Sequence, residues 1–246
     1  MKIYGLIGKS LGHSFSGKYF SEKFQKEHIR GCIYQNFELQ ELDKEIPKLK
    51  NLPGLAGLNV TIPYKTGIVS FLDELSAECK EMKACNCIKI ADGKWTGYNT
   101  DVVGFERSFL PHLEQHHDRA LVLGTGGASK AVAFVLKKLE IPFLKVTRKK
   151  ENAASAITYD EITKAVLDEY NIIINTTPVG MYPNVASFPS LPYQYISGKH
   201  YFYDLVYNPA KTLFLSKAEE KGAVIENGQD MLVIQAEESW RIWNSK

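Results

Sequence analysis

The chain has 246 residues, of which 44% are hydrophobic and 24% are charged, and its formal net charge at pH 7 is +2. This length allows one large or two modest domains with hydrophobic cores, and the composition is that of an ordinary globular protein. The small net charge and the lack of a basic stripe with interspersed aromatic residues give no sign of nucleic-acid binding. The apolar run within residues 1–8 is too short for a signal peptide, and no later run is long enough to span a membrane. We therefore expect a cytoplasmic protein with no nucleic-acid or membrane partner.

The first hundred residues alternate between strand-like and helix-like segments. Short apolar runs predict strands at 2–8, 32–37 and 57–60, and helical spacing of apolar residues predicts helices at 16–27 and 39–49. This alternation is typical of an α/β fold.

The segment after the third predicted strand is Thr61-Ile62-Pro63-Tyr64-Lys65. Proline cannot donate a hydrogen bond to a strand ladder but suits the first turn of a helix, so the segment predicts a helix that carries Lys65. A lone lysine after a proline turn is usually a surface residue. That interpretation of Lys65 stays open at this point.

Residues 85–90 and 94–98 flank Ala91-Asp92-Gly93, which predicts a β-hairpin. Cys85 and Cys87 lie at its start. Their spacing allows a metal site, but no histidine is close in sequence. In an alternating strand both thiols would face the same side, so we predict small core side chains and no metal. The four cysteines lack the density of a disulfide scaffold, which fits a reducing compartment.

The run Asn99-Thr100-Asp101 comes directly before the apolar start of another predicted helix. A side-chain oxygen at such a place can accept hydrogen bonds from the free amides of the first helical turn. The simplest interpretation of Asp101 is therefore a helix cap, and a catalytic carboxylate is the alternative.

The second half begins at Arg119 as a strand, a helix at 130–139 and a strand at 143–147. Its later strands are continuous apolar runs, which are typical of a parallel sheet covered on both faces. The remaining predicted elements are strands at 172–174, 201–206 and 223–225, a long loop at 178–192 and a final helix at 229–243.

The most informative stretch runs from Leu121 to Ala131, where an apolar strand leads into Gly124-Thr125-Gly126-Gly127 and then an alanine-rich helix. Glycine adopts backbone angles closed to other residues and lets the main chain approach a phosphate, and the helix offers unpaired N–H groups. This pattern predicts a dinucleotide site. A glycine turn that merely ends an ordinary α/β unit is the alternative.

Arg148-Lys149-Lys150 follows the next predicted strand, where an NAD site would carry an acidic residue for the ribose 2′-hydroxyl. Cations at this point suit a 2′-phosphate and therefore favour NADP. A solvated loop is the alternative, since it is the usual fate of a run of charges.

Eight segments together resemble the shikimate dehydrogenase family, whose members reduce 3-dehydroshikimate with NADPH. No single segment is decisive, but their order along nearly the whole chain would hardly arise by chance. The segments are 14–16, 59–65, Asn86, 99–101, the Gly124 turn, 175–181, 204–209 and 227–235.

The resemblance implies roles for individual residues. Lys65 matches the family's catalytic lysine, and Asp101 matches its partner carboxylate. Both would also contact the substrate, and the other positions that would line its pocket are Ser14, Ser16, Thr61, Asn86, Tyr207 and Gln235. The cofactor side would comprise Gly124, Thr125, Gly126, Gly127, Ala128, Thr147, Arg148, Lys149, Leu205 and Gly228.

The resemblance also implies a two-domain α/β fold. Residues 1–100 would form an α/β substrate domain, residues 101–228 a Rossmann-like NADP-binding domain, and the C-terminal helix in 229–246 would return to the first. Gln235 would reach the substrate from that helix. The implied protein is an NADP-dependent oxidoreductase of the shikimate pathway of aromatic amino acid biosynthesis, acting on a small molecule as a monomer or homodimer.

The sequence departs from the family pattern in two places. Members commonly have Asn-Arg-Thr where this chain has Thr147-Arg148-Lys149, and Cys87 stands where threonine usually follows the asparagine. The alternatives are a quinate/shikimate dehydrogenase with broader substrate or NAD use and a metabolite-binding homologue without catalysis. The basic run after residue 147 argues against NAD use. The presence of both Lys65 and Asp101 argues against a homologue without catalysis.

Overall fold

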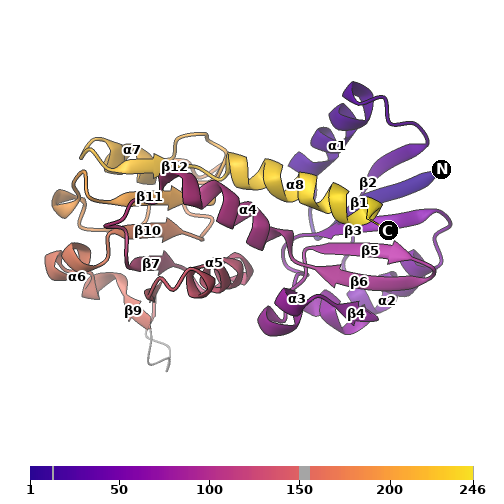
Figure 1. Ribbon diagram of the computed structural model, residues 1–246, viewed down its shortest axis with the longest axis horizontal. Coiled ribbons are helices and arrows are strands. Elements are labelled where there is room, and N and C mark those ends of the chain that lie inside the picture. Colours follow the sequence, from indigo (N-terminus) through magenta and orange to yellow (C-terminus); the bar gives the residue numbers. More distant parts are fainter. Residues whose placement is uncertain (13, 150–155, 246) are drawn as a thin grey trace. The chain divides into compact units, whose positions relative to one another are not determined.

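The structure, a computed structural model, describes residues 1–12, 14–149 and 156–245. The chain forms two compact units: unit 1 comprises Met1–Thr100 and Gln235–Lys246, and unit 2 comprises Asp101–Ile234 (Figure 1). Each unit is built on a six-stranded sheet, which confirms the expected α/β class. Across the described ranges, no helix combines the length and the hydropathy that a membrane span requires.

Unit 1 contains a mixed sheet flanked by helices. Its strands are β1 (Lys2–Gly8), β2 (Cys32–Glu38), β3 (Leu55–Val60), β4 (Glu74–Leu75), β5 (Cys87–Ala91) and β6 (Lys94–Tyr98). Its helical segments are α1 (Phe15–Lys26), α2 (Leu42–Lys50), η1 (Gly67–Phe71), α3 (Ala77–Met82) and the part of α8 (Gln229–Asn244) from Gln235 onward. The strand order is β2-β1-β3-β5-β6-β4, and β5 runs antiparallel to β3 and β6.

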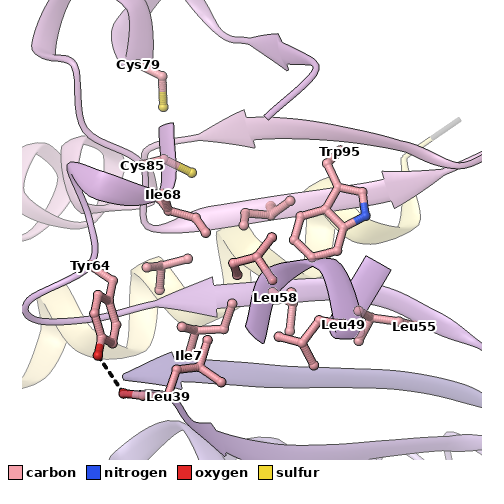
Figure 2. Close-up of a cluster of buried hydrophobic side chains, with 13 residues drawn as sticks. Ile7, Leu39, Leu49, Leu55, Leu58, Tyr64, Ile68, Cys79, Cys85 and Trp95 are labelled. Carbon is pink, nitrogen blue, oxygen red and sulfur yellow. Dashed lines mark hydrogen bonds between the residues drawn. The ribbon is translucent and has the colours of Figure 1, made fainter. Parts of the chain in front are cut away.

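Side chains of β3 alternate between two packed faces of this sheet. Leu58 and Val60 join the apolar cluster that contains Ile46 of α2 and Ile68 of η1 (Figure 2). On the other face Gly57 lies against α8, where an added Cβ would come within 2.4 Å of the ring of Trp243. That second face packs against α1 and α8 through Tyr4, Phe20, Phe24, Ala236, Ile242 and Trp243.

The predicted hairpin is confirmed. Ala91 of β5 pairs with Lys94 of β6, which leaves Asp92 and Gly93 as a two-residue turn with φ of 52° and 76°. Positive φ at both central residues is the geometry of a tight hairpin turn, and an Asp-Gly pair suits it.

The prediction that Cys85 and Cys87 face the same side is wrong. Cys85 belongs to the cluster with Leu58, whereas Cys87 belongs to the cluster with Tyr4. β5 begins only at Cys87, so the alternation of a strand does not extend back to Cys85. The prediction that both are core side chains is confirmed, because each is fully buried.

The prediction that Lys65 lies on a helix is also wrong. Residues 62–66 form turns, and the short 3₁₀ helix η1 begins only at Gly67. Tyr64 directs its hydroxyl into the core, where it donates to the carbonyl oxygen of Leu39 at 2.5 Å (Figure 2). The β-branched Thr61, Ile62 and Thr66 and the glycine at position 67 also disfavour a regular helix.

Unit 2 contains a parallel sheet in the order β12-β11-β10-β7-β8-β9, which confirms the predicted parallel arrangement. Its strands are β7 (Ala120–Leu123), β8 (Phe143–Thr147), β9 (Ala156–Thr158), β10 (Ile172–Asn175), β11 (Tyr201–Asp204) and β12 (Val224–Glu226). Its helical segments are α4 (Thr100–Phe109, from Asp101), η2 (Leu110–His112), α5 (Gly127–Lys138), η3 (Tyr159–Glu161), α6 (Lys164–Glu169), η4 (Tyr193–Tyr195), α7 (Leu213–Glu219) and the beginning of α8.

The predicted loop at 178–192 contains no helix or strand, so that prediction is confirmed. The short helices α3, α6 and α7 were not predicted. Each has only six or seven residues, which is too short for a clear helical period of apolar side chains.

Candidate active site

The cofactor-side residues predicted in unit 2 lie at one edge of its sheet. The parallel strands β7, β8, β10 and β11 all end there, in Leu123, Thr147, Asn175 and Asp204. Hydrogen bonds tie the following residues together: the amide of Gly124 donates to Val146 at 2.9 Å, that of Leu205 to Asn175 at 3.0 Å and that of Gly228 to Val206 at 3.2 Å. Ligands of open α/β sheets bind beyond this edge.

The turn between β7 and α5 has the geometry of a phosphate-binding loop. Gly124 has a φ of 105°, which is strained for any residue with a side chain. Gly126 caps α5 without a capping side chain, and an added Cβ on Gly126 or Gly127 would meet nothing within 4 Å. No capping side chain covers the start of this 12-residue helix, and a phosphate can approach its first amides closely. This fits the pyrophosphate of a dinucleotide.

Arg148 and Lys149 are exposed directly after β8. Thr147 is buried and donates its hydroxyl hydrogen to the carbonyl oxygen of Lys149 at 2.5 Å, which fixes the start of this turn. Burial raises the pKa of Tyr159, and the charge of Arg148 opposes that rise. Lys150, the third member of the predicted basic run, lies outside the described residues.

Asp204 organises the same edge, a role that the sequence did not reveal. Its carboxylate accepts hydrogen bonds from Asn175 Nδ2 at 3.0 Å, the Val206 amide at 3.0 Å and Thr212 Oγ1 at 2.6 Å. Burial nevertheless raises the pKa of Asp204 to about 6, because it outweighs these three bonds. The sequence did contain a signal for this role, because the neighbouring apolar strands β10 and β11 both end in a polar residue, Asn175 and Asp204.

Thr61 and Asn86, two of the predicted substrate-side residues, lie along one edge of the sheet of unit 1. The amide of Thr61, after β3, donates to the Ile7 carbonyl oxygen of β1 at 2.8 Å. Val60 donates to Asn86, just before β5, at 2.8 Å, and Asn86 donates to Tyr98, at the end of β6, at 3.1 Å. The antiparallel direction of β5 brings its start beside the ends of β3 and β6.

Asn86 and Gln235 are joined directly. Asn86 is 3% exposed, and its Nδ2 donates to Gln235 Oε1 at 3.3 Å and to Thr100 Oγ1 at 3.1 Å. The Thr100 amide donates to Asn86 Oδ1 at 2.6 Å. The carboxamide of Asn86 is therefore held from both sides, and it orients Gln235 on α8.

Asn59, near the end of β3, makes two further side-chain hydrogen bonds in unit 1. Asn59 Oδ1 accepts from the Tyr34 hydroxyl at 2.9 Å, and Asn59 Nδ2 donates to Ser239 Oγ at 2.8 Å. Burial raises the pKa of Tyr34, and a hydrogen bond with Ser16 opposes the rise. Tyr34 and Ser239 were not predicted, because neither belongs to a recognisable motif.

Ser14 and Ser16 flank the first residue of α1, Phe15. The hydroxyl oxygen of Ser14 is buried and has no hydrogen-bond partner among the residues that the structure describes. A buried hydroxyl without a partner is costly, so Ser14 is suited to a polar ligand.

The two predicted catalytic residues belong to different units. Lys65 is half-buried in the turn of unit 1, where its carbonyl oxygen accepts from the Cys85 amide at 2.7 Å. Asp101 is the first residue of unit 2 and is 3% exposed. α4 begins at Thr100, so Asp101 lies in its first turn rather than at the position before the helix that a cap requires.

In unit 2 a glycine turn follows β7 and a basic turn follows β8, so both lie at the same edge of a parallel sheet. This arrangement is that of a dinucleotide-binding α/β protein of the dehydrogenase class. The family model for the shikimate dehydrogenase substrate binding domain matches residues 6–88. A curated shikimate dehydrogenase (NADP(+)) of Caldicellulosiruptor bescii is 40% identical over 260 residues, which cover 99% of this chain and 89% of that protein.

Two solved structures agree. A chorismate mutase/shikimate 5-dehydrogenase fusion protein from Clostridium acetobutylicum is 37% identical, with a TM-score of 0.87 over 99% of this chain and 91% of that one. A shikimate dehydrogenase in complex with NADP+ is 32% identical, with a TM-score of 0.85 over 99% and 90% of the two chains. The chain belongs to the shikimate dehydrogenase family, and it is an oxidoreductase by that membership.

Proposed function

We propose that the chain catalyses the reversible, NADPH-dependent reduction of 3-dehydroshikimate to shikimate. The observation that carries this proposal is the 40% identity to a shikimate dehydrogenase (NADP(+)) across 99% of the chain. The arrangement of Thr61 and Asn86 at one sheet edge of unit 1, and of Gly124 and Arg148 at one sheet edge of unit 2, adds support.

Unit 1 supplies most of the substrate contacts in this proposal. A ring carboxylate, hydroxyls and a ketone require several short donors and acceptors, and Ser14, Ser16, Thr61, Asn86 and Gln235 supply that mixture. A site built on hydrogen bonds rejects analogues that lack a hydroxyl far better than an apolar site does. Tyr207, after β11 in unit 2, is proposed to complete the set.

Unit 2 is proposed to bind NADP, and the contacts at its sheet edge fit that cofactor. The start of α5 would hold the pyrophosphate, and Arg148 with Lys149 would hold the 2′-phosphate. Leu205 and Gly228 would lie beside the nicotinamide half, where a Cβ on Gly228 would come within 2.2 Å of the Leu205 carbonyl oxygen. When bound, the reduced nicotinamide supplies the hydride.

Lys65 and Asp101 are proposed as the catalytic pair. Negative charge develops on the substrate oxygen as its carbonyl carbon is reduced, and the ammonium group of Lys65 can stabilise that charge and donate a proton. The carboxylate of Asp101 can accept a hydrogen bond from a substrate hydroxyl and orient the lysine.

The domain roles follow from this assignment. Residues 1–100 with 229–246 would bind the substrate, and residues 101–228 would bind NADP. Four free cysteines fit a reducing compartment such as the cytoplasm. The chain would act as a monomer or homodimer.

The test is a steady-state assay with shikimate and quinate, each with NADP and NAD, followed by the absorbance of the reduced nicotinamide. We expect shikimate with NADP to be the best pair. Equal rates with quinate or with NAD would indicate a quinate/shikimate dehydrogenase. Binding of shikimate without turnover would indicate a metabolite-binding homologue and contradict the proposed catalysis.

A further inference from the structure

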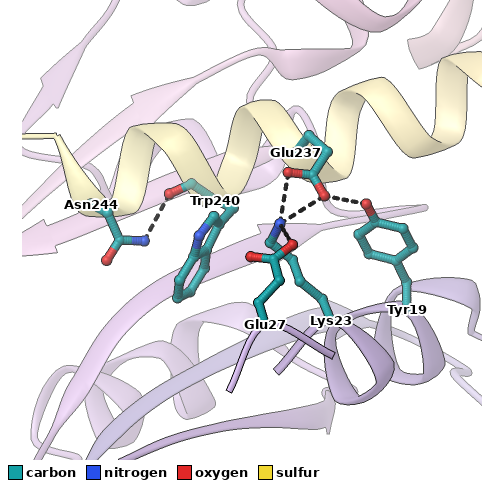
Figure 3. Close-up of polar contacts among 6 residues, drawn as sticks. All are labelled: Tyr19, Lys23, Glu27, Glu237, Trp240 and Asn244. Carbon is teal, nitrogen blue, oxygen red and sulfur yellow. Dashed lines mark hydrogen bonds and ion pairs between the residues drawn. The ribbon is translucent and has the colours of Figure 1, made fainter. Parts of the chain in front are cut away.

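A nearly buried lysine links two helices of unit 1. Lys23 lies on α1 with its side chain 7% exposed, and its Nζ contacts both carboxylate oxygens of Glu237 on α8 at 2.9 Å (Figure 3). It also contacts Glu27 on its own helix at 2.7 Å. The Tyr19 hydroxyl donates to Glu237 Oε1 as well. We call Tyr19, Lys23 and Glu237 the clasp.

Lys23 and Glu237 of the clasp are both charged near neutral pH. Burial lowers the pKa of Lys23, but its hydrogen bonds to Glu27 and Glu237 outweigh that effect and raise it. Burial raises the pKa of Glu237, but the hydrogen bonds from Tyr19 and Lys23 lower it overall. A cation this well buried is stable only with paired acceptors, so breaking the clasp leaves Lys23 with Glu27 as its one remaining carboxylate partner among the described residues.

Apolar contacts alone do not fix how α8 lies against α1. The Phe24 and Trp240 rings are 5.3 Å apart, and those of Phe20 and Trp243 are also 5.3 Å apart. Such contacts are favourable over a range of helix rotations because the hydrophobic effect has no direction. Hydrogen bonds of Gln235, Ser239 and Trp243 fix α8 against the sheet. The clasp adds charge-assisted hydrogen bonds of strict geometry that fix α8 against α1.

Both helices carry residues of the proposed substrate site. Ser14 and Ser16 lie at the start of α1, and Tyr19 is three residues after Ser16. Gln235 lies on α8 two residues before Glu237 and accepts from Asn86. A rotation of α8 would therefore move Gln235 relative to the two serines.

We propose that Tyr19, Lys23 and Glu237 are positioning residues that hold Gln235 in register with Ser14 and Ser16 for substrate binding. This inference rests on the proposed function. None of the three contacts the substrate in this assignment, so their effect should fall on substrate affinity rather than on turnover.

The test is the Glu237→Gln variant, which removes the charge and keeps an acceptor oxygen. We expect its KM for shikimate to rise roughly three- to tenfold, because a small displacement of one binding group weakens several aligned hydrogen bonds. kcat and the KM for NADP should stay within about twofold of wild type, since the reacting groups and the cofactor side are untouched.

Glu27→Gln is the matched control. Glu27 is the other carboxylate that pairs with Lys23, and it lies at the end of α1 rather than on α8. The variant therefore removes one negative charge beside Lys23 and leaves the link between α1 and α8 intact. We expect its KM for shikimate to stay within about twofold of wild type. Equal increases in both variants would overturn the proposal, because the effect would then belong to the charge of Lys23 and not to the link.

Tyr19→Phe provides a milder variant should Glu237→Gln fail to fold. It removes one hydrogen bond and should raise the KM for shikimate roughly two- to threefold. A lower melting temperature with unchanged KM, in either clasp variant, would show a merely structural role and overturn the proposal. If the unaltered chain shows no activity and no shikimate binding, the proposed function fails instead, and that outcome is read on the wild type alone.

Discussion

Lys65 is the residue on which the proposed chemistry depends most directly. Replacing Lys65 by alanine removes the group that would meet the developing negative charge, so kcat should fall by roughly two to four orders of magnitude. The KM for shikimate should change little, because the other polar residues remain. Steady-state kinetics measure both, and Lys80→Ala, at an exposed lysine of α3, is the control. A near-normal kcat would exclude Lys65 from the mechanism.

Arg148 is the residue proposed to set the preference for NADPH over NADH. Arg148→Ala should raise the KM for NADPH roughly 10- to 100-fold, the equivalent of one lost charge-assisted contact, because only NADPH carries the 2′-phosphate. The KM for NADH should stay nearly constant. Lys164→Ala, on α6 and paired with Asp168 on its own helix, should leave both values unchanged. An unaltered preference in Arg148→Ala would show that the turn after β8 does not bind the phosphate.

At the scale of elements, the packing of α8 on β3 requires glycine at position 57. An alanine Cβ would lie 2.4 Å from Trp243, whose ring is held by a hydrogen bond to Ile88 at 3.0 Å and by stacking on Tyr4 at 4.8 Å. Because the ring has no room to move, Gly57→Ala should lower the free energy of unfolding by roughly 1–3 kcal/mol, as measured by urea denaturation.

Gly17 on α1 offers the control for that substitution. An added Cβ there would meet only Asn36, at 3.5 Å, which is an ordinary contact. Since alanine favours a helix interior over glycine, Gly17→Ala should leave stability unchanged or raise it by up to about 1 kcal/mol. A loss of stability in Gly17→Ala as large as that in Gly57→Ala would contradict the explanation by Trp243.

For the whole molecule, Asp204 makes stability depend on pH. Its pKa is about 6 in the folded chain against a usual value of 3.8, so the folded state holds a proton that the unfolded state releases. The contribution of Asp204 to the free energy of unfolding is therefore complete below pH 3.8, where both states hold the proton. It is lost as the pH rises from 3.8 toward the folded pKa of about 6. The loss should be on the order of 3 kcal/mol, since one pKa unit corresponds to about 1.4 kcal/mol.

The Asp204→Asn variant isolates that effect, because other titrating groups cancel in the comparison. The free energy of unfolding of wild type minus that of the variant should shrink as the pH rises from about 4 to about 6. Urea denaturation across this range measures it. A difference that stays constant with pH would show that Asp204 titrates alike in the folded and unfolded chain.

Local patterns explain why much of the fold could be predicted. The bounds of β1 and β8 agree with their predictions at both ends, and the hairpin of β5 and β6 follows from an Asp-Gly turn. The glycine turn before α5 and the predicted parallel sheet are likewise present. Apolar periodicity and turn-forming residues act over a few neighbouring positions, so they can be read from the chain.

By itself, the sequence determined the α/β class, most strands, the dinucleotide turn and the family. Only the tertiary structure decided that Cys85 and Cys87 enter different cores and that Lys65 lies in a turn. It alone joined Asn59 to Ser239, 180 positions away, and Lys23 to Glu237, 214 positions away. Such contacts depend on how sheets and helices pack, and packing between distant segments leaves no local pattern for the sequence to display.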